Sequence, residues 1–355
     1  MEGFYIVFVH LGTDIPYWLT PNIRDHELRF KNDVVTVVND DNVARKLSDA
    51  GVAVWMWNRT KAQTRVFAGD ARTLAFRDGF WQKTSDRFLA LADFQAETAR
   101  PILQVETDSI LFNKIRDVDF SVMGEKTCFP LASWKHGLGS VVFFPSADCS
   151  RKLAEHFLAE KSPAANSTSV NDMTRLASYY RNNPSDVCVL PTGFSSLEGN
   201  LFGNDPEFMR VSSANLESFG GVFDALTIGE FVAGHDSRNG RGFRKIGSNS
   251  PGFFPTQPAF HYSLAGDDLY VQGTNSEEKL PVYNLHVHSK QLAFFSQKSR
   301  PNMLRKRLAK QDQGSYWEFD FRGFRSHLTE YFNGRSLSER LFRKVEALVA
   351  ERGGG

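Results

Sequence analysis

The segment PILQVETDSILF, residues 101–112, carries the clearest signal of the fold. Its apolar run is interrupted once, by Glu106, Thr107 and Asp108, and then resumes. Strands of a parallel sheet are covered on both faces and read as continuous apolar runs, and ligands bind beyond their carboxyl ends. Two carboxylates there are costly to desolvate unless they are paired or hold a cation. The stretch predicts a buried strand ending either in a metal site or in a turn whose acids cap backbone groups or pair with arginine.

Apolar runs and helical patterns alternate on both sides of this stretch. The runs are short and rich in β-branched residues, as buried strands are: FYIVFVHL at 4–11, VVTVV at 34–38, VAVWMW at 52–57 and GSVVFFP at 139–145. The helical patterns are ARKLSDAG at 44–51, SDRFLALADFQAE at 85–97 with Ser85 as its cap, SRKLAEHFLAEK at 150–161 and VNDMTRLASYYRNN at 170–183. This alternation predicts an α/β fold, Rossmann-like, with a mostly parallel central sheet flanked by helices.

The composition is that of an ordinary globular protein. The chain has 355 residues, of which 41% are hydrophobic, with 42 Lys plus Arg against 41 Asp plus Glu. Its three cysteines are too few and too widely spaced for a disulfide framework or a zinc ribbon, which fits a reducing compartment. The sequence lacks a long apolar run and a basic, cleavable leader, so we expect a cytoplasmic protein. Aromatic and basic residues do not interleave, so no nucleic-acid partner is indicated.

The chain divides by composition near residue 290. Residues 219–247 are rich in glycine and charge, as loops around a ligand are, whereas residues 291–355 are basic with amphipathic helical patterns. We expect a catalytic domain at 1–290, with a nucleotide-binding half at about 1–125 and an acceptor half at about 126–290, followed by a helical extension. The basic tail either lies on the inner face of an anionic membrane, as a peripheral contact, or packs across the domain.

A second polar constellation is VYNLHVHSK at 282–290. With the period of two of a strand, Asn284, His286, His288 and Lys290 project from one side and the apolar residues from the other. A histidine of this row could complete a metal site while Lys290 neutralises phosphate oxygens, or the row could be the outer face of a solvated edge strand.

Three further acids lie in polar surroundings. Asp172 stands at the start of the helical pattern at 170–183, where it could satisfy the helix dipole or orient an acceptor hydroxyl. Asp224 and Asp236 belong to FDALTIGEFVAGHDSRN at 223–239, a segment punctuated by glycine. Each acid is either an ordinary solvent-exposed polar residue or a candidate base or orienting group.

Taken in this order, the segments resemble the nucleotide-sugar-dependent glycosyltransferases of GT-A fold, especially bacterial and viral enzymes of surface-polysaccharide assembly. Four places carry the resemblance: FVHLGTDIPYWL followed by VVTVVNDD, SDRFLALADF followed by LQVETDSIL, FDALTIGEFVAGHDSRN, and NLHVHSK. The chain departs from the family pattern where Glu106 replaces the first Asp of a DxD motif. It departs again where Glu230 and Ser237 stand in place of Gln and Pro.

The resemblance implies a GT-A fold with a C-terminal helical extension, and a role for each polar group. The donor nucleotide would lie on residues from the first strands and the following helix: His10, Gly12, Thr13, Asp40 or Asp41, and Arg87. A divalent metal, manganese or magnesium, would be held by Asp108 and His288, with His286 and Glu106 as further candidates. Glu106 and Thr107 would otherwise contact the ribose, and Lys290 the phosphates. Asp172, Asp224 and Asp236 are the candidates for catalytic base or orienting group.

The function implied is sugar transfer from a nucleoside-diphosphate sugar to a glycan or lipid-linked acceptor. Two other classes remain open on the residues alone. A metal-dependent hydrolase could use His286 and His288 as ligands, although such pairs usually stand on an early strand. A non-catalytic nucleotide- or carbohydrate-binding protein could retain the same polar groups without turnover.

Overall fold

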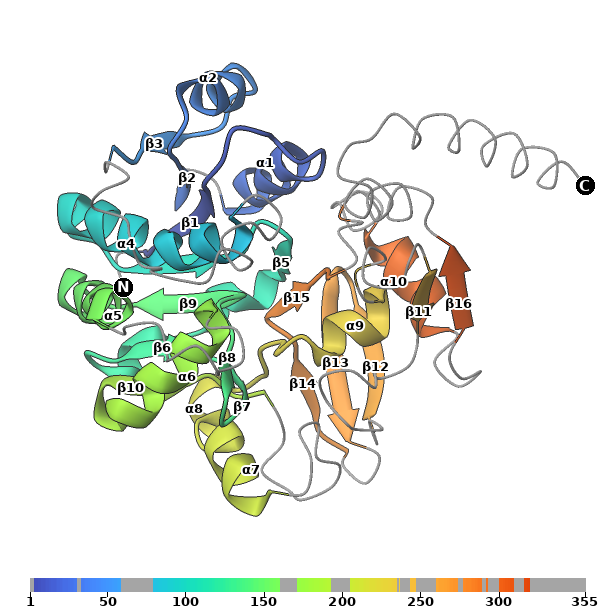
Figure 1. Cartoon of the computed structure of the whole chain (residues 1–355). Helices are drawn as coiled ribbons and strands as arrows, with labels where there is room; N and C mark the ends of the chain where they lie inside the picture. Colours follow the sequence, from blue (N-terminus) through green and yellow to red (C-terminus); the bar gives the residue numbers. More distant parts are fainter. Residues whose placement is uncertain are drawn as a thin grey trace, which may run out of the picture.

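The structure is a computed structural model. It describes residues 3–30, 33–58, 79–159, 171–192, 205–234, 236, 243–246, 260–273, 277–288, 292, 300–309 and 316–319. Figure 1 shows the arrangement of the helices and strands along the chain. The α-helices of this part are α1 (Leu19–Phe30), α2 (Asp41–Asp49), α4 (Phe80–Thr98), α5 (Ala147–Ala159), α6 (Asp172–Asn182), α7 (Pro206–Ser213), α8 (Leu216–Phe219), α9 (Thr227–Ala233) and α10 (Arg300–Leu308).

The strands belong to one large sheet and to several small ones. The large sheet contains β1 (Tyr5–His10), β2 (Val34–Val38), β3 (Val54–Met56), β4 (Ile102–Val105), β6 (Thr127–Phe129), β9 (Val141–Phe144) and β10 (Val187–Val189). The small sheets contain β5 (Ser109–Leu111), β7 (Leu131–Ser133), β8 (His136–Gly137), β11 (Phe243–Ile246), β12 (Phe260–Ala265), β13 (Asp268–Gly273), β14 (Lys279–Pro281), β15 (Asn284–His286) and β16 (Tyr316–Phe319). Among the described residues, short 3₁₀ helices lie at Asn113–Asp117, Phe120–Met123 and Pro184–Asp186.

The large sheet has seven strands in the order β10-β6-β9-β4-β1-β2-β3. Strand β1 is parallel to both β2 and β4, β2 is parallel to β3, and β6 is parallel to β10. Only β9 among these seven runs antiparallel to its neighbours, β4 and β6. The prediction of an α/β fold with a mostly parallel central sheet flanked by helices is therefore confirmed.

Both faces of the large sheet are covered, which explains why its strands are apolar throughout. Along β1, Val7 packs with α4, α5 and α6 in one core cluster, whereas Ile6 and Phe8 pack with α1 and α2 in another. All three side chains are at most 2% exposed. Because successive side chains of a strand point to opposite faces, a strand buried on both sides must be apolar at every position.

Helix α4 begins earlier than the sequence indicates. Ser85 was predicted to cap it, but the helix begins at Phe80, after Gly79 in the left-handed conformation. Ser85 lies inside the helix and is fully buried. The prediction of Ser85 as the cap is wrong because this position is buried within α4, and packing outweighs the local preference of serine for a helix end.

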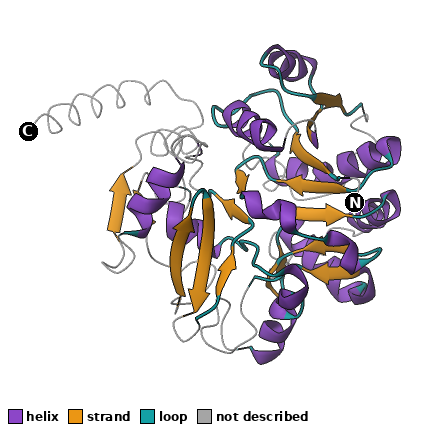
Figure 2. Cartoon of the chain, turned by 180° about the vertical axis from the view of Figure 1, so that it is seen from behind, coloured by secondary structure: helices purple, strands orange, loops and turns teal. Residues whose placement is uncertain are grey.

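A second, smaller body lies beside the large sheet. Strands β12, β13 and β14 form an antiparallel sheet, and β15 pairs with β5 in the region between the two bodies (Figure 1). Figure 2 shows the same two-part arrangement from behind. Apolar side chains of β12–β14, α9, α10 and β15 share one core cluster. The strand that carries His286 thus bridges the two bodies instead of joining the large sheet.

The beginning of the basic C-terminal segment is part of this second body. In α10, Leu304 and Leu308 pack into the core cluster of β12–β15, and α10 contacts α9 and β12. Arg300 forms an ion pair of 2.5 Å with Asp25 of α1. The expected helical extension beyond residue 319 lies outside the residues that the structure describes. Among the described helices, none is long and apolar enough to cross a membrane.

Candidate functional site

The polar interruption at 106–108 forms the turn between two strands. Strand β4 ends at Val105, the N–H of Ser109 donates to the carbonyl of Glu106 at 2.9 Å, and β5 begins at Ser109. Strand β15 runs antiparallel to β5 with His286 opposite Ser109. This pairing carries His286 to the carboxyl end of β4, the edge where ligands of parallel sheets bind.

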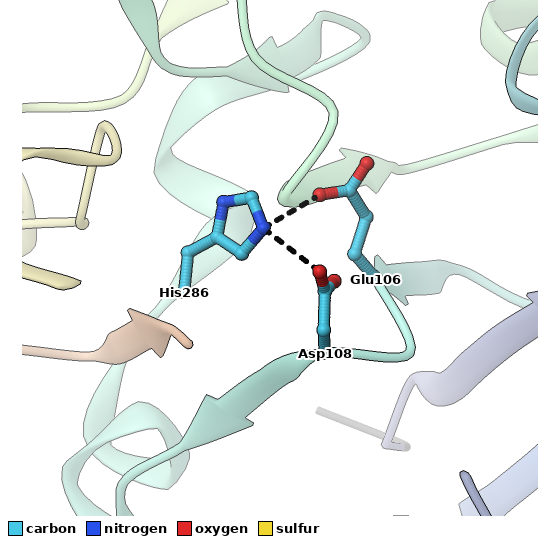
Figure 3. A group of neighbouring side chains, drawn as sticks. All are labelled: Glu106, Asp108 and His286. Atoms are coloured by element: carbon cyan, nitrogen blue, oxygen red, sulfur yellow. Dashed lines mark hydrogen bonds and ion pairs between the residues drawn. The ribbon is translucent and has the colours of Figure 1, made fainter. Parts of the chain in front are cut away.

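The three side chains at this edge converge. The Nε2 atom of His286 lies 3.2 Å from Oδ2 of Asp108 and 3.6 Å from Oε2 of Glu106, as Figure 3 shows. One ligand atom from each residue lies within 4.8 Å of the other two. Two carboxylate oxygens and an imidazole nitrogen so placed are able to share one divalent cation.

An arginine links this group to Asp172. Arg87 of α4 contacts Glu106 at 2.5 Å through one nitrogen and Asp172 of α6 at 2.6 Å through another. Burial alone would lower the pKa of Arg87, but the two carboxylates outweigh it and raise the pKa above its ordinary value. Burial raises the pKa of Asp172, although Arg87 offsets part of that effect. Asp172 therefore holds Arg87, and Arg87 holds Glu106, whose other oxygen faces His286.

Asp224 fixes the backbone of His286. Its side chain is fully buried and accepts hydrogen bonds from the N–H groups of Ile228, Gly229 and His286 at 2.9–3.0 Å. Burial raises the pKa of Asp224 to about 6, while these donors lower it. Asp224 thus lies just before α9 and joins the first turn of this helix to the backbone of His286.

His288 is not part of the three-residue group, although its ring lies edge-on to that of His286 with the centroids 5.7 Å apart. The chain turns after β15, since the N–H of His288 bonds to the carbonyl of His286 at 2.9 Å, and the alternation of strand side chains ends there. The Nδ1 atom of His288 accepts the N–H of Asp236 at 3.1 Å and lies 3.7 Å from Oε1 of Glu230. The structure brings His286 to the carboxylates, and His288 with Asp236 to Glu230. The geometry favours His286 over His288 as metal ligand.

Glu230 is a buried acid that sequence reasoning left out of the site. Burial and the neighbouring Asp224 together raise its pKa to about 7, and His286 opposes part of this rise. The available signal was its departure from the family pattern, in which glutamine occupies this position. A carboxyl that titrates near neutrality beside two histidines is typical of functional sites.

Of the residues expected to bind the nucleotide, those that lie at the carboxyl ends of β1 and β2 are His10, Gly12, Thr13, Asp40 and Asp41. Gly12 follows β1 with a φ of +153°, and its N–H donates to Oδ1 of Asn39 at 2.9 Å. The Nζ atom of Lys83 lies 3.7 Å from where a Cβ on Gly12 would be, so any larger residue would approach this cation. Asn39 and Lys83 were not among the predicted residues, because an isolated amide or lysine carries no sequence signal.

The remaining predicted nucleotide residues have local roles. The Nε2 atom of His10 bonds to the carbonyl of Asp14 at 2.8 Å, and Asp40 caps α2 by accepting the N–H of Val43 at 3.0 Å. Thr13 and Asp41 are exposed. The backbone carbonyl of Thr107 accepts a hydrogen bond from the side-chain amide of Asn22 at 2.9 Å. Lys290 lies outside the residues that the structure describes.

Comparison with known proteins finds no matching family model and no matching curated protein. Solved structures with partial similarity include the galactosyltransferase LgtC in complex with donor and acceptor sugar analogs, at 13% identity over 59% of this chain and 83% of that chain, with a TM-score of 0.39. Mouse xyloside xylosyltransferase 1 is similar at 10% identity over 53% of this chain and 85% of that chain, with a TM-score of 0.34. A cytidylyltransferase from Leptospira borgpetersenii is similar at 12% identity over 51% of this chain and 71% of that chain, with a TM-score of 0.32. Similarity of this extent establishes neither a family nor an activity.

Proposed function

We propose that this protein is a metal-dependent glycosyltransferase that moves a sugar from a nucleoside-diphosphate sugar to a glycan or lipid-linked acceptor. One observation carries the proposal: Glu106, Asp108 and His286 converge at the carboxyl end of the central strand β4. The order of the sequence motifs supports the same class, because the family that they resemble places its metal ligands on the strand of the DxD motif and on a late strand.

The donor set suits a divalent cation. Asp108 is 5% exposed and His286 is 8% exposed, and a buried carboxylate is costly unless a counter-charge accompanies it. Arg87 provides such a charge for Glu106 and Asp172, and it contacts the Glu106 oxygen that does not face His286. Carboxylate oxygens suit Mg²⁺ and Mn²⁺, and the imidazole shifts the preference towards Mn²⁺. When bound, such a cation would neutralise charge on the diphosphate of the departing nucleotide.

The protein holds these ligands in place before any substrate arrives. The N–H of Glu106 bonds to the carbonyl of Ser140 at 3.0 Å, and one carboxylate oxygen is fixed by Arg87. Asp224 holds the N–H of His286, as described above. Electrostatic stabilisation is most effective when the groups that provide it need no reorganisation during the reaction. In this proposal Arg87 and Asp224 orient metal ligands and are not themselves bases.

The nucleotide would lie along the adjacent edge of the sheet. The loop around Gly12, the start of α2 at Asp40, and Lys83 surround the ends of β1 and β2, next to β4. A lysine beside a glycine loop provides charge and backbone donors for phosphate oxygens. Lys290 is proposed as a second phosphate contact on the basis of the family resemblance.

A nucleotide-sugar panel tests the proposal. We expect slow release of nucleoside diphosphate with one donor in the presence of Mn²⁺, faster release with the correct acceptor, and none after chelation with EDTA. Asp108→Asn and His286→Ala should abolish release. Asp148→Asn, which changes an exposed acid of α5, should leave it unchanged.

Two outcomes would replace the proposal. Metal-dependent cleavage of esters or amides without nucleotide binding would identify a hydrolase. Nucleotide binding without turnover, across the donor panel and a range of acceptors, would identify a binding protein.

A further inference from the structure

We propose that Asn22 of α1 is a positioning residue for the metal-binding turn, because it holds both carbonyl groups that flank Asp108. The inference rests on the proposed function only in assigning a cation to Glu106, Asp108 and His286. It adds that Asn22, which precedes Glu106 and Asp108 by 84 and 86 residues, controls the geometry of this turn without contacting substrate.

The side-chain amide of Asn22 makes two hydrogen bonds to the turn. Its nitrogen donates to the carbonyl of Thr107 at 2.9 Å and to the carbonyl of Ser109 at 2.9 Å. Asn22 is 5% exposed, so water does not compete effectively for these groups. An amide nitrogen has two hydrogens, and this arrangement uses one for each carbonyl.

Helix α1 takes the place of a neighbouring strand along one edge of β5. On the other edge, β15 provides the partner, and the N–H of Val287 donates to the carbonyl of Asp108 at 2.9 Å. Backbone groups of a strand alternate between its two edges, so the carbonyls of 107 and 109 face α1 while that of 108 faces β15. Asp108 is thereby fixed from both sides.

The next turns of α1 continue the same edge. The Nδ1 atom of His26 bonds to the carbonyl of Asn22 at 2.8 Å, and its Nε2 atom bonds to the N–H of Leu111 at 3.0 Å. A carbonyl accepts and an N–H donates, so Nδ1 carries the proton and Nε2 is the acceptor. Arg29 then donates to the carbonyl of Leu111. Asn22, His26 and Arg29 therefore present donor, acceptor and donor in the order that the β5 backbone requires.

Asn22 is the member of this series that bears on the metal. The bonds of His26 and Arg29 end at Leu111, three residues beyond Asp108, whereas those of Asn22 end at the residues on either side of it. Two fixed carbonyls leave the peptide planes around Asp108 little freedom, and this sets the direction of its side chain. Loss of the amide would free both planes and leave two buried carbonyls without these donors.

Measurement of Mn²⁺ affinity tests the inference without relying on turnover. The probe is Mn²⁺ alone, with free Mn²⁺ quantified by electron paramagnetic resonance over a titration of the full chain. We expect Asn22→Leu, which keeps the size of the side chain but not its donors, to weaken binding at least tenfold. Asn22→Ser keeps one donor, so its affinity for Mn²⁺ should fall between that of Asn22→Leu and that of the unsubstituted protein. This second variant tests the inference even if Asn22→Leu does not fold.

Gln95→Met is the matched control. Gln95 of α4 is fully buried, and its amide nitrogen also donates to two backbone carbonyls, those of Arg100 and Phe144, both at 3.0 Å. Its loss should lower the melting temperature as loss of Asn22 does but leave Mn²⁺ affinity unchanged. Folded Asn22 variants with the affinity of the unsubstituted protein would overturn the inference, and so would absence of Mn²⁺ binding by the unsubstituted chain. Mn²⁺ binding that depends on Asn22, without nucleotide-sugar turnover, would overturn only the proposed function.

Discussion

The Nε2 atom of His286 lies 3.2 Å from an oxygen of Asp108, although 178 residues separate the two along the chain. The contact exists because β15 pairs with β5 and places His286 opposite Ser109. An imidazole and two carboxylates that already face one another lose little conformational freedom when they bind a cation.

We therefore expect Mn²⁺ to raise the melting temperature of the protein. Binding to the folded state alone adds about 2.7 kcal/mol at a concentration of 100 times the dissociation constant. Asp108→Asn and His286→Ala should each remove the Mn²⁺-dependent shift, as measured by differential scanning calorimetry. Asp148→Asn should retain it, and an equal shift in all the proteins would show that the ion binds elsewhere.

Removal of Arg87 should destabilise the fold strongly. Arg87→Met leaves Glu106 and Asp172 without their shared counter-charge, and breaking a buried ion pair from one side costs about 3–5 kcal/mol. Urea unfolding measures this change in the free energy of unfolding. The double variant Arg87→Met, Asp172→Asn should recover part of the loss, because it removes one of the two orphaned charges. Strictly additive effects of the two substitutions would contradict a direct interaction.

The sequence was sufficient for β1, β2, β3, β4 and β9 of the large sheet, because a strand that is buried on both faces is apolar at every position, whereas β6 and β10 were not among the predicted strands. Val34–Val38 and Tyr5–His10 are readable without context for this reason. The carboxylate pair at 106–108 was equally readable, since charge interrupts an apolar run. Ser85 was misread because the packing of α4 against the sheet depends on residues far away in the sequence.

The residues that complete and support the site were harder to predict from the sequence, for a related reason. A period of two places His286 and His288 on the same side, and only the end of β15 after His286 separates their positions. Asn22 looks like any polar residue of an amphipathic helix, because its role depends on a strand edge that lies 85 residues further along. Side chains that act on backbone groups of distant residues leave no local pattern.

Gly229→Ala should displace His286 and weaken Mn²⁺ binding. A Cβ at this position would lie 1.9 Å from the carbonyl oxygen of His286 and 2.8 Å from Oδ2 of Asp224. Alanine favours a helix over glycine by about 1 kcal/mol, but overpacking against backbone costs about 1–3 kcal/mol, so the clash should prevail. Chemical unfolding and Mn²⁺ titration give the two readouts.

Gly266→Ala provides the comparison for this substitution. Its φ of +63° disfavours alanine, but no atom lies within 4 Å of the added Cβ. It should cost about 1–2 kcal/mol through backbone strain without changing Mn²⁺ affinity. If both variants bind Mn²⁺ as the unsubstituted protein does, close packing of α9 on β15 does not control the site.

Glu230 should make the protein less stable as the pH rises. Its pKa increases from 4.5 to about 7 on folding, chiefly through burial, so the folded state binds this proton more tightly than the unfolded state. The stabilisation is complete below pH 4.5 and is lost as the pH rises to about 7, with a total on the order of 3 kcal/mol. Glu230→Gln, which restores the residue of the family pattern, removes this titration.

Urea unfolding of both proteins between pH 5 and 8, with EDTA present to exclude bound metal, measures the effect. Asp224 titrates in both proteins and so largely cancels from the comparison, because its pKa of about 6 comes mainly from its own burial. The free energy of unfolding of Glu230→Gln, minus that of the unsubstituted protein, should increase as the pH increases. Parallel curves would mean that Glu230 is ionised in the folded state throughout this range. His288, 3.7 Å away, would then be the group that stabilises its charge.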